Sequence, residues 1–447
     1  MIRNKNLGAF SAVLLTVSIV ALVLTPGAWA QSKYKTLYRF KATDGHFPIG
    51  VIFDQAGNLY GTTQGGVSGP CNDGCGTVFK LAPNSGGGWT QSVLYTFCSL
   101  TNCTDGAVPL AGLVMDQVGN LYGTTNGGGT NGIGVGGFGT VFKLAPNSDG
   151  SWTESVLYSF CSLKNCADGQ QPIAGLIFDI AGNLYGTTGV GGLGHASGCD
   201  GCGVVFKLTP KADGGWTESV LHSFCSFKSC RDGLAPVGGM ITDAVGNLYG
   251  TTYFGGGLGG CGADSCGVVF KLIPKADGSW KEEVLHRFTG KDGDRCTAGL
   301  IFDRAGNLYG TAGGGKLSTC NFYGCGIVFK LTPNSKGGWT ETVLHEFVGS
   351  NGAYPNNSLI FGQDGNLYGT TEQGGNLSDC QGFGCGVVFK LAPNSKGRWN
   401  ATVLHYFVDD PGAYPHSGVI FDAAGNLYGA TGGDAVATLG SVFEITP

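Results

Sequence analysis

The stretch DQAGNLYGTT covers Asp54–Thr63, and its core, GNLYG, is written seven times along the chain. The copies begin at Gly57, Gly119, Gly182, Gly246, Gly306, Gly365 and Gly425. Copies that recur at an even period of about 60 residues are typical of propellers and other arrays of one structural unit. The 447 residues therefore predict tandem repeats of a single unit.

Each repeat contains four short runs with the composition of β-strands. In the third repeat they cover Ala174–Asp179, Asn183–Thr188, Gly203–Pro210 and Trp216–Phe224. β-Branched and aromatic residues fill the runs, and Gly, Asp and Pro separate them. One repeat therefore predicts a four-stranded antiparallel sheet, and seven such sheets predict an all-β fold, a seven-bladed β-propeller.

The two ends of the chain predict how the ring of blades closes. The last repeat stops after its third strand, at GSVFEITP (Gly440–Pro447). The segment SKYKTLYRF (Ser32–Phe40) aligns with the fourth strand Trp89–Phe97. We therefore expect the N-terminal strand to complete the last blade.

Charged residues at fixed strand positions predict ion pairs between third and fourth strands. The third strands carry Lys80, Lys143, Lys207, Lys271, Lys330 and Lys390, and four of the fourth strands carry Glu154, Glu218, Glu282 and Glu341. The last repeat reverses the signs, with Glu444 in its third strand and Lys33, Lys35 and Arg39 in the expected N-terminal partner.

In six copies an aspartate precedes GNLYG by three residues: Asp54, Asp116, Asp179, Asp243, Asp303 and Asp422. We expect its carboxylate to accept backbone N–H groups in the turn, and the first glycine to adopt a positive φ. As calcium ligands these aspartates would lack the spacing of an EF-hand loop. The pentapeptide thus indicates a structural turn.

The first thirty residues differ from the repeats. Arg3 and Lys5 precede the mostly apolar run Leu7–Leu24, and AWA ends it with small residues at Ala28 and Ala30. This pattern indicates a signal peptide over residues 1–30, followed by the propeller over residues 31–447. The protein is then secreted, periplasmic or on the cell surface, with no membrane span after cleavage; the alternative is an uncleaved membrane anchor.

Sixteen of the 17 cysteines fall into close pairs, which in an oxidising compartment indicate disulfides. The pairs are Cys71/Cys75, Cys98/Cys103, Cys161/Cys166, Cys199/Cys202, Cys225/Cys230, Cys261/Cys266, Cys320/Cys325 and Cys380/Cys385. Alternatives are a redox or zinc half-site at the CDGC of Cys199, and four metal-binding thiolates from the first two pairs. Cys296 is left over, either free or competing for Cys261 or Cys266.

Each unit of the form D-x-x-G-N-L-Y-G-T-T is followed by a third strand similar to C-G-x-V-F-K-L. This pattern resembles the GloVer-type tandem repeats of secreted bacterial proteins. More loosely, they are similar to the propeller repeats of NHL and sensor-domain proteins. The resemblance covers residues 32–447 and implies export, in some members with a surface anchor. It implies no established activity.

Candidate binding residues lie in the loops after the second and fourth strands, because these loops vary and contain all the cysteine pairs. Acidic or amide side chains precede a glycine there, at a predicted channel mouth: Asp44, Asp105, Asp168, Asp232, Asp292 and Asn351. Loop aromatics accompany them: Tyr253, Phe254, Phe322, Tyr323 and Phe383. The Asp-Gly pairs suit plain turns better than a ring of ligands, and the aromatics equally suit small cores under disulfides.

Composition narrows the function without naming a ligand. A net charge of -5 argues against nucleic acid as a partner. The chain contains no G-x-S-x-G, H-E-x-x-H or P-loop motif, so we predict no catalytic residue, cofactor or metal. A packing role is predicted for the shared fourth-strand position of His222, His286, His345 and His405, where Tyr95 and Tyr158 stand in other repeats.

These observations predict a monomeric binding or adhesion module for an extracellular polymer, either a glycan or a protein. The alternative is a polysaccharide-active enzyme, a lyase or a hydrolase, that uses the same loops. An enzyme would need a few catalytic groups unique to one or two blades, whereas these loops differ mostly in length, Gly and Cys.

Overall fold

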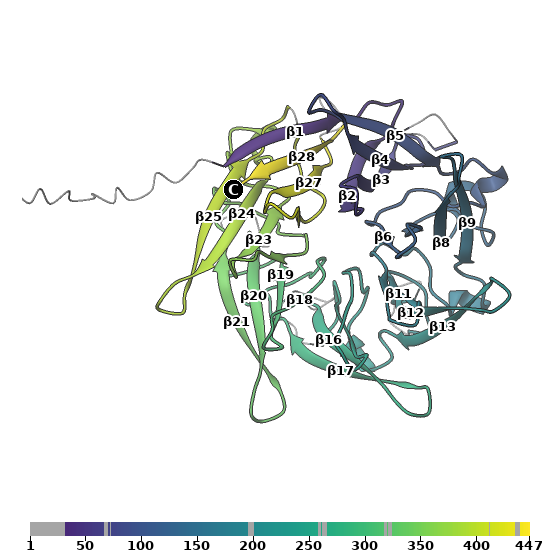
Figure 1. Ribbon diagram of the computed structural model, residues 1–447. Helices are drawn as coiled ribbons and strands as arrows, with labels where there is room; N and C mark the ends of the chain where they lie inside the picture. The colour runs from purple at the N-terminus through teal and green to yellow at the C-terminus, as the bar shows by residue number, and fades with distance from the viewer. Residues whose placement is uncertain are drawn as a thin grey trace, which may run out of the picture. The chain divides into compact units, whose positions relative to one another are not determined.

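The predicted seven-bladed propeller is confirmed by a computed structural model of the chain (Figure 1). The structure describes residues 32–66, 70–71, 73–194, 201–257, 261, 266–316, 320, 324–410, 412–433 and 439–447. Its strands form seven four-stranded antiparallel sheets, one to each blade. The predicted signal peptide lies outside the described residues.

The four strands of each blade are antiparallel neighbours, from the innermost to the outermost. The first strands are β2 (His46–Phe53), β6 (Val114–Met115), β10 (Ile177–Phe178), β14 (Ile241–Thr242), β18 (Ile301–Phe302), β22 (Ile360–Phe361) and β26 (Ile420–Phe421). The second strands are β3 (Leu59–Gly65), β7 (Leu121–Thr125), β11 (Leu184–Thr188), β15 (Leu248–Thr251), β19 (Leu308–Ala312), β23 (Leu367–Thr371) and β27 (Leu427–Thr431).

The third strands are β4 (Thr77–Pro83), β8 (Thr140–Pro146), β12 (Val204–Pro210), β16 (Val268–Pro274), β20 (Ile327–Pro333), β24 (Val387–Pro393) and β28 (Ser441–Thr446). The fourth strands are β5 (Trp89–Thr96), β9 (Trp152–Ser159), β13 (Trp216–Ser223), β17 (Trp280–Arg287), β21 (Trp339–Glu346), β25 (Trp399–Tyr406) and, from the N-terminus, β1 (Lys33–Arg39). Short 3-10 turns occur at η1 (Thr101–Cys103), η2 (Gly134–Gly136), η3 (Lys164–Cys166), η4 (Lys228–Cys230) and η6 (Cys380–Gly382).

Strand β1 closes the ring as the sequence predicted. It pairs antiparallel with β28, with Lys35 opposite Glu444 and Arg39 opposite Ser441. Figure 1 shows the purple N-terminal strand beside the yellow C-terminal strands. The last blade therefore contains both ends of the propeller.

A buried pair of phenylalanines joins each blade to the next. Phe160, just after a fourth strand, meets Phe206 of the following third strand edge-on, with ring centroids 5.0 Å apart. At the closing junction Phe40 and Phe79 lie 4.9 Å apart in the same way. Because each ring is at most 5% exposed, these pairs form a continuous apolar layer between the blades.

The expected ion pairs between lysines of the third strands and the four glutamates of the fourth strands are wrong. Lys207 is opposite Ser219, and its amino group lies 5.6 Å from the ring centre of Tyr185. Glu218 is opposite Leu208, one register step away. Since successive side chains in a strand point to opposite faces, the lysine and the glutamate cannot meet.

Two described strand pairs do place opposite charges across from each other. Lys35 is opposite Glu444 in the last blade, as the reversed signs predicted. In the fourth blade Lys271 is opposite Glu283, the residue after the expected Glu282. Charge pairing thus depends on the register of each strand and is no general property of the repeat.

The structure explains both glycines, the asparagine and the tyrosine of the repeated pentapeptide, as the third copy illustrates. Asp179 accepts hydrogen bonds from the backbone N–H groups of Ala181 and Asn183, and from the hydroxyl of Tyr185 at 3.0 Å. Gly182 takes a φ of +80° in the turn. The closing Gly186 lies under Phe206: a Cβ there would be 2.4 Å from that ring. The turn role predicted from the sequence is confirmed.

Candidate binding face

We define the loop face as the described parts of the loops that follow the second and fourth strands of each blade. In the first three blades the fourth-strand loop contains a short disulfide, Cys98–Cys103, Cys161–Cys166 or Cys225–Cys230. A 3-10 turn fills each ring, and the residue before that turn is apolar and exposed: Leu100 at 55%, Leu163 at 52% and Phe227 at 58%. These disulfides hold apolar side chains out of the core and toward solvent.

The predicted acidic residues of these loops, Asp105, Asp168 and Asp232, are buried. Asp168 is fully buried and accepts hydrogen bonds from Tyr158 Oη at 2.7 Å, Ser162 N at 2.8 Å and Leu163 N at 3.1 Å. Asp105 is bound in the same way by the corresponding residues of the first blade. These carboxylates therefore fasten the loop to the outermost strand of their own blade.

The other predicted Asp and Asn residues contact the fourth-strand position that Tyr158 occupies in its blade, or the backbone of their own loop. Asp232 accepts from Ser226 N and lies 3.4 Å from Nε2 of His222. Asp292 lies 3.4 Å from Nε2 of His286 and accepts from Thr289 N, and Asn351 contacts His345 at 3.2 Å. Asp44 accepts from the Tyr38 hydroxyl and from Lys41 N. The prediction that these Asp and Asn side chains lie at the mouth of the channel is wrong, because their hydrogen-bond partners and contacts lie on the outermost strands.

A glutamate from the next blade approaches each of four such aspartates. Burial, followed by the negative charge of Asp168, raises the pKa of Glu218 to about 8. Burial is also the main cause that raises the pKa to about 7 at Glu154, Glu282 and Glu341. One carboxyl oxygen of each of these glutamates is buried and makes no hydrogen bond. At neutral pH Glu218 is therefore mostly protonated and the other three are partly protonated, which reduces the repulsion between carboxyls of adjacent blades.

Replacing Glu218 by Gln is expected to stabilise the protein at pH 8 and to change its stability little at pH 5. The pKa of Glu218 is about 8 in the folded state, above its ordinary value of 4.5. Between these values the folded state binds more protons than the unfolded state, so stability falls as pH rises. With solvent screening of the partly exposed side chain, we expect a gain of about 1 kcal/mol at pH 8 by denaturant unfolding.

The first blade provides the reciprocal control for this prediction. It has Gln91 at the corresponding position, where Nε2 lies 3.4 Å from the backbone oxygen of Asp44. A Gln91→Glu variant should lose stability at pH 8 and retain it at pH 5. Equal effects of either variant at both pH values would show that repulsion between blades does not act there.

One of these blade junctions opens into a cavity of about 300 Å³. Phe227, Arg231, Asp232, Glu282 and Arg287 are among its lining residues. Its acids differ in charge state. At Asp232 burial is outweighed by the nearby imidazole of His222 and by hydrogen bonds from Ser226, which lower the pKa, whereas burial raises the pKa of Glu282. Nε of Arg287 is buried and makes no hydrogen bond. The cavity therefore combines an exposed ring with hydrogen-bonding groups of both signs.

Disulfides are confirmed for seven of the predicted cysteine pairs. Cys199 lies outside the described residues, so its pairing with Cys202 stays a prediction. The sulfurs of Cys75, Cys98 and Cys103 lie within 4.8 Å of one another. The first two cysteine pairs, which could alternatively have supplied four metal-binding thiolates, therefore form two adjacent disulfides. Disulfides of this number are typical of oxidising compartments.

In the fourth, fifth and sixth blades, the loop after the second strand contains a disulfide. The second cysteine of each of these disulfides lies in the core and is not part of the solvent-facing surface. Cys325 is bonded to Cys320, is fully buried, and belongs to the same apolar cluster as Tyr309. Cys266 and Cys385 are equally buried at the corresponding positions. This corrects the expectation that the cysteine pairs belong wholly to the variable face, because Cys325 and its counterparts anchor their loops from beneath.

The remaining cysteine, Cys296, is buried and outside these disulfides. Burial, followed by the negative charge of Asp294, raises the pKa of its thiol. Cys261 and Cys266 are bonded to each other, so Cys296 does not compete for either of them here. Its thiol thus packs as a small apolar group in the core.

A family model built on repeats matches three overlapping segments, residues 24–197, 133–316 and 260–447. Together the segments cover nearly all of the chain and every blade. The chain belongs to the Gloeobacter/Verrucomicrobia repeat family. The predicted resemblance is thereby confirmed, whereas no curated protein matches the chain.

The aromatic residues predicted for a binding face have different positions in this Gloeobacter/Verrucomicrobia repeat protein. Phe383 is 54% exposed within the Cys380–Cys385 ring. Tyr253 and Phe254 are half-buried and contact each other edge-on at 4.4 Å. Phe322 and Tyr323 lie outside the described residues. Phe383 is thus the more exposed candidate, whereas Tyr253 and Phe254 pack partly against each other.

Sequence reasoning missed the exposed apolar residue inside the hexapeptide disulfides and the glutamates between blades. An alignment of the repeats carried the first signal, since C-S-L-x-x-C or C-S-F-x-x-C places an apolar residue where loops are otherwise polar. The glutamates between blades could be seen in the sequence only as a Glu that recurs at one fourth-strand position.

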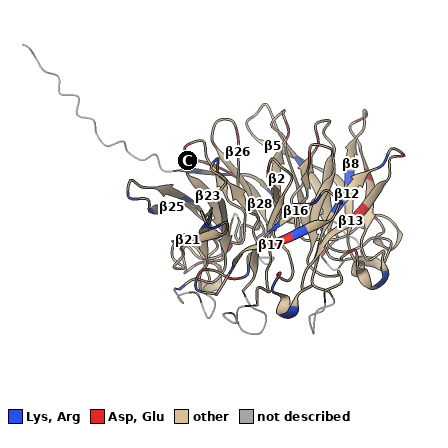
Figure 2. Cartoon of the chain, turned by 90° about the horizontal axis from the view of Figure 1, so that it is seen from below, with Lys and Arg blue, Asp and Glu red and all other residues tan. Residues whose placement is uncertain are grey.

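Figure 2 shows Lys, Arg, Asp and Glu scattered over the family member's described strands and loops. No helix in the described part of the chain is long and apolar enough to cross a membrane.

Proposed function

We propose that this protein is an exported binding module that holds an extracellular saccharide polymer on its loop face. The observation that carries the proposal is the exposed ring of Phe227 beside the cavity with Asp232, Glu282 and Arg287. A flat apolar ring next to carboxylates and a guanidinium suits a sugar, whose ring faces are apolar and whose edges carry hydroxyls. Export rests on the segment 1–30 and agrees with the disulfides.

The disulfides also support recognition. Leu100, Leu163 and Phe227 stand in the first three blades, so their loops are neighbours around the ring. Loops closed by a disulfide lose less conformational entropy when a ligand binds. Three similar contact points on neighbouring blades suit a repetitive, extended ligand better than one small molecule.

A polysaccharide-active enzyme on the same face is the second candidate, and one observation favours it. Asp232 and Glu282 have pKa values displaced in opposite directions, with Glu282 raised to about 7. Paired carboxyls in different protonation states can serve as acid and base in glycoside cleavage. However, Asp168 with Glu218 repeats the arrangement in the neighbouring blade, which favours a structural role for the pairs.

A polysaccharide panel, read for retention and for released product, tests the proposal. Phe227→Ala should weaken retention of the bound polysaccharide about tenfold, because an aromatic anchor contributes about 1–2 kcal/mol to binding. The matched control is Ile180→Ala, which removes a fully exposed apolar side chain from a turn on the opposite face.

Retention that falls in both variants, or in neither, contradicts binding at Phe227. If the parent protein retains no polysaccharide but releases product, the enzyme takes the place of the binding module. Glu282→Gln should then abolish product release, because it removes the proton donor.

A further inference from the structure

Six tryptophans occupy one position in the fold, the first residue of the fourth strand. In the third blade Trp216 lies opposite Pro210. Its indole contacts Tyr122 of the preceding blade edge-on, at a centroid distance of 6.5 Å. The same contact joins Trp152 to Tyr60 at 6.1 Å. The other members of the set are Trp89, Trp280, Trp339 and Trp399. Ring contacts also join Trp280 to Tyr185 and Trp399 to Tyr309, and Trp89 and Trp339 belong to the same apolar clusters as Tyr428 and Tyr249. The indoles thus pack near the GNLYG tyrosine of the blade before them.

The seventh position has no indole, because the fourth strand of the last blade comes from the N-terminus. Lys33 pairs with Thr446, so the next residue outward, Ser32, falls opposite Pro447, where the other blades have tryptophan. The tyrosine that a seventh tryptophan would cover is Tyr368, in the sixth blade. Among the described residues no tryptophan takes that place.

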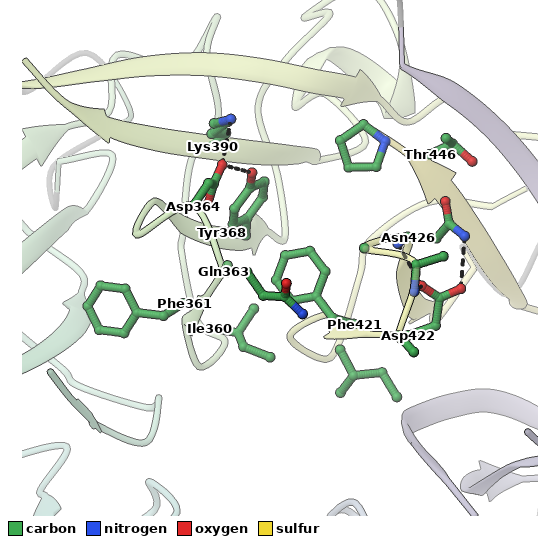
Figure 3. A pocket seen from close by; sticks show the side chains of 16 residues that line it. Ile360, Phe361, Gln363, Asp364, Tyr368, Lys390, Phe421, Asp422, Asn426 and Thr446 are labelled. Atoms are coloured by element: carbon green, nitrogen blue, oxygen red, sulfur yellow. Dashed lines mark hydrogen bonds and ion pairs between the residues drawn. The ribbon is translucent and has the colours of Figure 1, made fainter. Parts of the chain in front are cut away.

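A cavity of about 660 Å³ lies at this junction, and Figure 3 shows the side chains that line it. Its lining includes the turns after the first strands, which lie on the face opposite the loop face. Its walls include Ile360, Phe361, Phe421 and Tyr368, and Pro447 lies at its edge. The corresponding cavity between the fourth and fifth blades is about 470 Å³, and Trp339 lines it. The cavity between the sixth and last blades is thus larger and lacks the tryptophan ring that lines its counterpart.

The sixth repeat also departs from the others beside this cavity. It has Gly362 where six copies have aspartate, and Asp364 takes over the contact with the Tyr368 hydroxyl at 2.9 Å. Asp364 also forms an ion pair with Lys390 at 3.0 Å, shown by a dashed line in Figure 3. Besides its apolar walls, the cavity is therefore lined by polar side chains, those of Gln363, Asp364, Lys390, Asp422 and Asn426.

We propose that this cavity binds a planar aromatic molecule of indole size. The six other junctions accept an indole against the same tyrosine, so the surfaces that remain here are complementary to such a ring. Apolar walls supply most of the binding energy, and the carboxylate of Asp364 or the amide of Gln363 can accept a ring N–H. The site is independent of the polymer site proposed above, because it lies on the opposite face.

The test measures binding of indole to residues 31–447, since residues 32–447 form a compact unit of their own. Calorimetry and NMR chemical shifts should give one site with a Kd of about 0.1–1 mM. Ser32→Trp should fill the cavity with the protein's own indole. We expect it to weaken indole binding at least tenfold and to raise Tm by about 2 °C or more.

Trp216→Ala provides the converse variant, because it creates the same vacancy between the second and third blades. It should bind two equivalents of indole, as engineered apolar cavities bind aromatic molecules. If the parent protein binds no indole, or if Ser32→Trp binds it as tightly as the parent, the proposal is overturned. The Ser32→Trp comparison decides the matter even if Trp216→Ala fails to fold.

Discussion

Deletion of Ser32–Phe40 is expected to lower the free energy of unfolding by about 5 kcal/mol or more. The deletion removes β1, whose Leu37 is 9% exposed, and Phe40, which is 5% exposed. Each buried side chain contributes about 1.5–3 kcal/mol, and the loss of β1 also leaves β28 as an open edge. Since a domain of this kind is stable by only about 5–15 kcal/mol, the truncated chain should unfold in mild denaturant. Guanidinium unfolding followed by circular dichroism measures the difference.

A circular permutant separates ring closure from the mere presence of the segment. Thr446 pairs with Lys33, so a short turn can join Pro447 to Ser32, as the turn between Pro83 and Trp89 joins the same strands in the first blade. With new ends in a turn between β12 and β13, this chain should retain most of the parent stability. A deletion variant that unfolds at the same guanidinium concentration as the parent would mean that β1 does not close the ring.

The second large effect is expected at the glycine that closes GNLYG. Gly186→Ala should lower the free energy of unfolding by about 3 kcal/mol, because its Cβ would lie 2.4 Å from the Phe206 ring and 2.9 Å from Leu176. Both neighbours are almost fully buried, so neither can move into solvent. Thermal and denaturant unfolding of the variant measure the loss.

Two variants show whether the loss comes from the close approach to Phe206. Gly182→Ala, in the same copy, has no heavy atom within 4 Å of its Cβ and should cost only about 1 kcal/mol, through its positive φ. Combining Gly186→Ala with Phe206→Leu should cost less than the sum of the single changes by about 1 kcal/mol or more. Strict additivity would contradict a steric origin.

Positions that lie close in sequence were predictable, and positions brought together from different blades were not. Asp179 and Asn183 are four residues apart, so the turn chemistry of the repeat was readable directly. Asp168 and Glu218 belong to different blades, and their approach depends on how two sheets pack. The same limit explains the wrong charge pairs: the strand order was predicted correctly, but a register one residue different decides whether Lys207 faces Ser219 or Glu218.

The number of blades, the four strands in each, the short disulfides and the closure by the N-terminal strand could all be predicted from the order of residues. These features follow from local composition and from the period of the repeat, which do not depend on contacts between blades. The packing of the blades was needed to see which carboxyls share a junction, that Cys325 lies in the core while Phe227 points to solvent, and where an indole is missing beside Tyr368. Burial and empty space arise between sheets, because each blade packs against a surface that the next blade supplies.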